Sequence, residues 1–107
     1  MANTYVRLAA LRPANTNEAE LYEVAASEYI VASLFICNQS AVARTYNVAI
    51  TDATGAATDE DWIAYETELQ PNLTHKIVIA CGDGDTIRVQ ASVADLISFV
   101  LTGLKVT

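Results

Sequence analysis

The chain has 107 residues, of which 52% are hydrophobic and 18% are charged, and its formal net charge is -7. This length suits one domain, residues 1–107. The basic residues are scattered singly, which argues against nucleic acid as a partner because phosphate binding needs clustered Lys and Arg. No apolar run approaches the roughly 20 residues of a membrane span, so we expect no membrane partner either.

Apolar and polar residues alternate along most of the chain, which is the pattern of strands with one buried face. Clusters of Gly, Pro, Asn, Asp and Ser separate the alternating runs. This pattern predicts an all-β protein: a single antiparallel β-sandwich, or jelly-roll-like domain, of about 7–8 strands. The expected strands are residues 4–11, 20–25, 29–37, 43–51, 61–69, 74–81, 85–91 and 96–104.

Both ends of the chain are candidates for contacts with other subunits. Residues 1–12 could form an N-terminal arm that adds a strand to a neighbour, and Tyr5 and Arg7 are its candidate interface residues. The C-terminal residues 103–107 could act in the same way, with Lys105 as a further candidate.

Two segments are harder to interpret. The stretch 17–29 is rich in Glu and Ala, which are good helix formers, so a short turn of helix competes there with a strand. In the run that begins at Trp62, alternation predicts that Ile63, Tyr65 and Leu69 share one side of the strand.

The sequence from Cys81 to Asp85, CGDGD, lies between two expected strands. Gly82 and Gly84 can supply positive φ, and the aspartates can bond to local amides. A calcium ion needs about six to eight oxygen ligands, more than this loop offers, and the spacing of an EF-hand loop is missing. We therefore interpret the segment as a hairpin turn.

No set of residues has the pattern of a catalytic or metal site. His75 is the single histidine and is expected at the surface. Because the N-terminus lacks the apolar centre of a signal peptide, Cys37 and Cys81 are expected to be buried, reduced thiols of a cytoplasmic product. Glu66 and Glu68 share a strand face, as neighbours on any exposed strand do. We expect no enzymatic activity, no metal and no cofactor.

Trp62 follows the acidic stretch Asp59-Glu60-Asp61, which we interpret as a solvated loop. Trp62 and Tyr65 could fill the core, or they could form an exposed patch that binds a sugar or another subunit. Both are therefore candidate interface residues. An alternative function that follows is a carbohydrate-binding adhesion module.

Seven short motifs follow one another along the chain: MANTY at 1–5, LYEV at 21–24, FICNQ at 35–39, TYNVA at 45–49, WIAY at 62–65, LQPNLT at 69–74 and GDTIRV at 84–89. The series resembles a group of small β-sandwich proteins from the virions of tailed bacteriophages. The resemblance covers nearly the whole chain and its motifs are structural.

The resemblance implies a virion component that acts by assembly and has no catalytic residues. The expected role is a capsid decoration, or cement, protein that stabilises the head. Its implied partners are the major capsid protein and copies of itself, in a homo-trimer or other homo-oligomer. A tail, baseplate or fibre component is the alternative placement. The implied location is the virion, after synthesis in the cytoplasm of the bacterial host.

Overall fold

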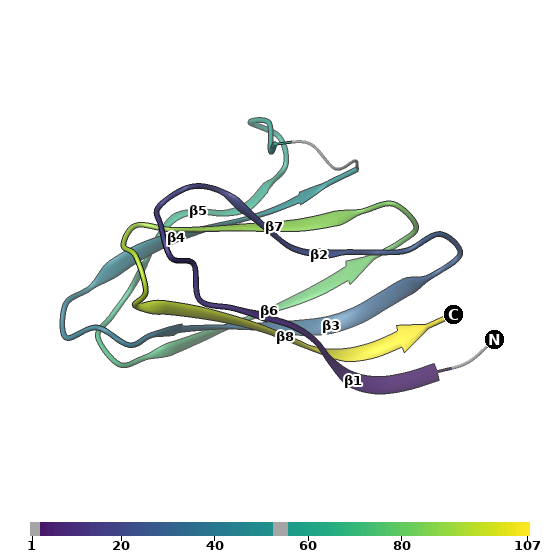
Figure 1. The fold of residues 1–107 in the computed structure, drawn as a ribbon, viewed down its shortest axis with the longest axis horizontal. Coiled ribbons are helices and arrows are strands. Elements are labelled where there is room, and N and C mark those ends of the chain that lie inside the picture. The colour runs from purple at the N-terminus through teal and green to yellow at the C-terminus, as the bar shows by residue number, and fades with distance from the viewer. Residues whose placement is uncertain (1–2, 53–55) are drawn as a thin grey trace.

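The structure is a computed structural model that describes residues 3–52 and 56–107. The described residues form eight strands in two antiparallel sheets, which face each other as two layers (Figure 1). The prediction of an all-β sandwich is confirmed. The strands are β1 (Asn3–Leu11), β2 (Ala19–Glu23), β3 (Tyr29–Asn38), β4 (Arg44–Thr51), β5 (Trp62–Leu69), β6 (Thr74–Cys81), β7 (Thr86–Ala91) and β8 (Ile97–Val106).

The strand order is that of a jelly roll. Sheet A has the order β1-β8-β3-β6, and sheet B has the order β2-β7-β4-β5. Every connection except the one between β4 and β5 passes from one sheet to the other. Residues 3–52 and 56–107 contain no helix, so the helical alternative for 17–29 is wrong, and no described segment is a helix that could cross a bilayer.

Both chain ends belong to sheet A. Residues 3–11 of the expected N-terminal arm form β1, which pairs with β8 from Asn3 to Leu11. On its other side β8 pairs with β3 as far as Val106. Gly103 lies in the middle of this three-strand contact, where an added Cβ would come within 2.6 Å of the Ala32 Cα. The close approach of β3 to β8 therefore requires a residue without a side chain.

The space between the sheets is filled by the residues that alternation predicts to point inward. Phe99 of β8 and Tyr46 of β4 meet there edge to face, with ring centroids 6.4 Å apart. Removal of this set from water is the main stabilising contribution to the fold. The predicted inward residues found in or against the core are Tyr46, Val48, Ile50, Ile77, Ile79, Cys81, Ile87, Val89, Ala91, Ile97, Phe99 and Leu101.

In β5 the predicted alternation is wrong. Leu69 is buried, but Ile63 and Tyr65 are 46% and 59% exposed. The reason is two shifts in the register of β5 against β4, beside Val48. Each shift places an extra residue in β5, which reverses the side that later residues face. Glu66, in the shifted segment, has a φ of 47°.

The CGDGD segment is a turn, but not the predicted hairpin. Its two flanking strands lie in different sheets, β6 in sheet A and β7 in sheet B. The Asp85 carboxylate accepts a bond from the Gly82 N–H at 2.9 Å, as expected, whereas the only glycine of the described residues with positive φ is Gly84, at 84°. Local turn chemistry does not specify which sheet the next strand joins, and this explains the error.

Asn38, at the end of β3, is a fully buried polar residue. Its Nδ2 donates to the carbonyl oxygens of Val42 at 3.0 Å and Leu69 at 2.9 Å. Its Oδ1 accepts a bond from the Ser40 N–H at 2.9 Å. The side chain thereby ties the β3–β4 connection to the end of β5, which gives the Cys-Asn motif a structural role.

Candidate functional site: the outer faces of the two sheets

We use the name apolar face for the outward side chains of sheet A. Residues paired across neighbouring strands lie on the same face. Tyr5 of β1 pairs with Leu104 of β8, which pairs with Val31 of β3, which pairs with Ala80 of β6. Tyr5 and Val31 are 84% and 47% exposed. The four strands together therefore form an apolar row across the whole sheet.

A more polar row, in which Thr102 of β8 pairs with Ser33 of β3, separates this row from a second apolar one. In that second row Val100 of β8 pairs with Phe35 of β3. Val78, the outward residue of β6 two positions before Ala80, is 69% exposed. The charged side chains that the described strands place on this face are Arg7 and Lys76, and no Asp or Glu is among them. The chain holds 13 acidic residues in all, so its negative charge lies elsewhere.

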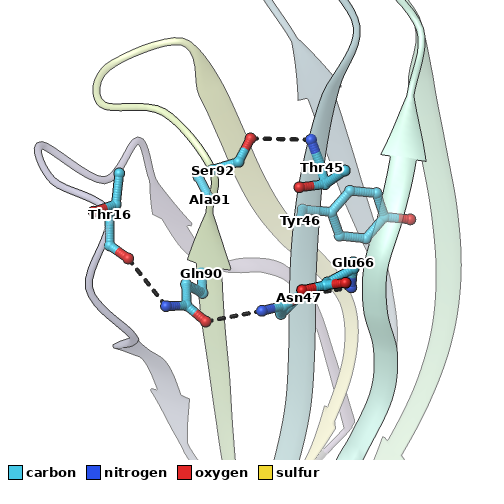
Figure 2. Close-up of a pocket in the computed structure, with 8 residues that line it drawn as sticks. All are labelled: Thr16, Thr45, Tyr46, Asn47, Glu66, Gln90, Ala91 and Ser92. Atoms are coloured by element: carbon cyan, nitrogen blue, oxygen red, sulfur yellow. Dashed lines mark hydrogen bonds between the residues drawn. The ribbon is translucent and has the colours of Figure 1, made fainter.

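We use the name polar face for the outer face of sheet B, which holds a hollow of about 240 Å³ lined by eight residues. Figure 2 shows a row of hydrogen bonds across its floor. The Gln90 Nε2 donates to the Thr16 carbonyl at 3.0 Å, and the Asn47 Nδ2 donates to the Gln90 Oε1 at 2.8 Å. The Asn47 Oδ1 accepts a bond from the Glu66 N–H at 2.5 Å. The row joins β7, β4 and β5.

This row leaves hydrogen-bonding groups available to a ligand. The side-chain amides of Asn47 and Gln90 each have a second N–H that these bonds do not use. The Ser92 Oγ accepts a bond from the Thr45 N–H at 3.0 Å and keeps its own proton to donate. The Glu66 carboxylate has no partner within the described parts of the chain. The hollow therefore combines neutral donors with one anionic acceptor.

A second hollow, of about 350 Å³, lies beside the first and is lined by Asp59, Trp62 and Tyr65. The rings of Trp62 and Tyr65 are tilted by 55° with centroids 5.4 Å apart. Tyr65 lines this hollow and the next residue, Glu66, lines the first one. The irregular register of β5 thus places two consecutive side chains in neighbouring hollows.

The five candidate interface residues fall in three places. Tyr5 and Arg7 lie on the apolar face. Trp62 and Tyr65 form the aromatic hollow of the polar face. Lys105 instead lies 3.9 Å from the carboxylate of Glu28, at the end of the sandwich. The structure therefore places four of the candidates on two opposite faces and Lys105 on neither. Strand order is the information that the sequence lacked.

The Asn47, Gln90 and Ser92 side chains were missed in the sequence. An outward polar residue on an alternating strand is the ordinary pattern of a solvated face, so their positions gave no indication of a shared site. Only the neighbouring position of β4 and β7 in sheet B brings them together.

The remaining candidates for chemistry have structural roles. His75 is half-buried rather than at the surface, because β6 directs it inward to the Tyr46 hydroxyl, 3.0 Å from its Nδ1. Cys81 is buried, Cys37 is half-buried, and both are free thiols. Burial, and secondarily the charge of Asp85, raises the pKa of Cys81 to about 11. The described residues contain no group of three or more metal-binding side chains.

Searches against protein-family models and against curated proteins return no match for this chain.

Proposed function

We propose that this protein is a structural component of a tailed-bacteriophage virion, a capsid decoration protein that covers and stabilises the head. The observation that supports this role is the apolar face. A contiguous apolar patch on the outside of a small domain is typical of a surface that binds another protein. The proposed location in a virion rests on the resemblance of the sequence motifs to small virion proteins.

The charges of the apolar face favour the partner. Its described strands offer Arg7 and Lys76 and no acidic side chain. Two copies placed face to face would bring only basic groups together, and like charges oppose such a contact. A shell of major capsid protein with apolar residues and carboxylates would match this face better. Copies of the decoration protein would then contact one another through other surfaces in the homo-oligomer.

The test uses phage particles that lack this protein. They should lose infectivity at a lower temperature than complete particles, and the purified protein should restore the difference. Particles that assemble and survive heating unchanged without it would contradict the cement role.

Matched variants connect this test to the apolar face. Val31→Asp places a carboxylate on the apolar face, and Ile63→Asp makes the same change at a similarly exposed position of sheet B, with 47% and 46% exposure respectively. Val31→Asp should reduce co-sedimentation with particles at least about tenfold, which corresponds to about 1.4 kcal/mol. Ile63→Asp should bind as the unchanged protein does. Equal binding by both variants would remove the apolar face from the proposal.

The alternative placement in the tail, baseplate or fibre is separated by electron cryo-microscopy. Density for this domain on the head supports the decoration role. Density only on the tail would overturn it and favour the alternative.

A further inference from the structure

We propose that the polar face of sheet B is a binding site for a neutral saccharide, in addition to the assembly role of the opposite face. The site consists of the two neighbouring hollows, one aromatic and one polar. Their volumes, about 240 and 350 Å³, lie just below and just above the lower limit for small-molecule sites, about 300 Å³.

The aromatic hollow suits the apolar side of a sugar ring. Trp62 and Tyr65 are held 5.4 Å apart at a tilt of 55°, so they form two walls rather than one flat stack. Aromatic rings exposed at a surface provide a large apolar contact area with little conformational freedom to lose. The C–H groups of a pyranose ring can pack against these walls while its hydroxyl groups remain at the edge.

Asp59 stands at the rim of the aromatic hollow in a turn that is fixed before any ligand arrives. The Asp61 carboxylate accepts bonds from the Thr58 N–H at 2.8 Å and the Thr58 hydroxyl at 3.0 Å. The Asp61 carbonyl also accepts a bond from the Ile50 N–H at 3.0 Å, which attaches the turn to β4. The backbone at Asp59 is therefore already ordered, and only its side chain loses freedom when it binds a sugar hydroxyl.

The polar hollow supplies the other half of a sugar site. Asn47, Gln90 and Ser92 have donors to spare, and the Glu66 carboxylate has only acceptors. A sugar hydroxyl donates one bond and accepts others, so a polyol satisfies both kinds of group at once. Glu66 has a φ of 47°, a conformation that a residue with a side chain rarely adopts and that is concentrated at functional sites.

The charge of the site favours a neutral ligand over an acidic one. Glu66 and Asp59 both carry carboxylates, and the chain has a net charge of -7. The two carboxylates and the net negative charge would repel the uronate groups of an acidic polysaccharide.

Trp62 makes the proposal direct to test, since it is the single tryptophan of the chain. The emission of Trp62 is recorded while maltohexaose, cellohexaose, N-acetylchitohexaose or hexagalacturonic acid is added. At least one of the three neutral oligosaccharides should shift the emission saturably, and hexagalacturonic acid should bind more weakly. No saturable shift with any neutral probe would overturn the proposal, as would preferred binding of the acidic probe.

Variants then assign the binding to the two hollows. Tyr65→Ala and Glu66→Gln should each weaken binding of the probe that responds by at least about tenfold in the emission assay. Trp62→Ala should do the same in titration calorimetry. The control is Tyr5→Ala, which removes an 84% exposed tyrosine from the apolar face. Equal weakening by Tyr5→Ala would show non-specific contact and contradict the site.

Two further measurements keep the interpretation clear. Thermal unfolding of each variant distinguishes loss of the site from loss of the fold, and a variant that unfolds early is replaced by Tyr65→Phe, which should retain most of the binding. Particle binding and saccharide binding are each measured for both Val31→Asp and Tyr65→Ala. The first change should affect particles alone and the second saccharide alone, so either proposal can fail without the other.

Discussion

The two sheets are built on the same inward pattern and differ on the outside. The strands of sheet A keep a regular register except for one shift in β1, between Arg7 and Ala9, and their outward residues form two apolar rows with a more polar row between them. In sheet B, both edge strands carry shifts, β2 between Glu20 and Tyr22, and β5 beside Val48. There the outward surface is polar and hollowed. The apolar rows suit a protein partner, whereas the shifted register of β5 places Tyr65 and Glu66 in the two hollows of sheet B.

The largest expected effect comes from breaking the close packing within sheet A. Gly103→Ala would place a methyl group 2.6 Å from the Ala32 Cα and the Val31 carbonyl oxygen, both of which are backbone atoms that cannot rotate away. The expected loss in free energy of unfolding is about 2–3 kcal/mol, measured by urea denaturation. Gly82→Ala is the control, because nothing lies within 4 Å of its added Cβ. Similar midpoints for the two variants would contradict the tight β3–β8 contact.

The next prediction compares the two faces of sheet A through the reactivity of one cysteine on each. Cys37 is half-buried among the outward residues of β3, whereas Cys81 is buried and its pKa is raised to about 11, chiefly by burial. At pH 8 very little of Cys81 is thiolate, the form that reacts. Labelling with a disulfide reagent should therefore show one fast thiol and one that reacts at least about a hundredfold more slowly.

Variants assign the fast and the slow labelling reactions to the two thiols. Cys37→Ser should remove the fast phase, and denaturant should make Cys81 react. On complete virions, the proposed docking of the apolar face should protect Cys37 as well. A fast reaction that persists in Cys37→Ser would show that Cys81 is accessible to the reagent. It would contradict the burial of the inward face of sheet A at this position.

A smaller effect concerns the irregular strand of sheet B. Glu66→Gly should raise the free energy of unfolding by about 0.5–1 kcal/mol, because glycine adopts a φ of 47° without strain. Glu68→Gly, two residues along the same strand and without positive φ, should lower the free energy of unfolding by a similar amount. Glu66→Gly should also bind saccharide more weakly. A destabilised Glu66→Gly variant would indicate that the bulge is held by the side chain.

The sequence predicts the core of this protein well because burial of one sheet face forces a period of two, and Ile79, Val89 and Phe99 follow it. The prediction fails at Ile63 and Tyr65, because a bulge in β5 depends on its register with β4 and has no local code.

The apolar face and the polar face also could not be read from the sequence. Tyr5 and Val31 are far apart in the chain and share a surface only because β8 lies between β1 and β3. Asn47 and Gln90 become neighbours only because β4 pairs with β7. Alternation separates inside from outside, and the outside is then divided by strand order, which is a non-local property.

The last effect lies where the two sheets meet at one end of the sandwich. The Tyr22 hydroxyl, on β2, donates to the Glu28 carboxylate at 2.7 Å, and Glu28 in turn lies 3.9 Å from the Lys105 Nζ on β8. Burial raises the pKa of Tyr22 to about 12 from a usual 10.0, and the bond and charge of Glu28 add to the shift. The folded state therefore holds this proton more tightly than the unfolded chain does.

Because the folded pKa is the higher one, the contribution of Tyr22 to stability is complete below pH 10 and is lost as the pH rises towards 12. At pH 9 Tyr22→Phe should be less stable than the unchanged protein, by about 1 kcal/mol for one lost hydrogen bond. The difference should shrink between pH 10 and 12 in urea denaturation measured across this range. Tyr5→Phe, which alters an 84% exposed tyrosine, should follow the unchanged protein throughout. A difference that stays constant with pH would show that Tyr22 stabilises the junction of the sheets by packing, and not through its proton.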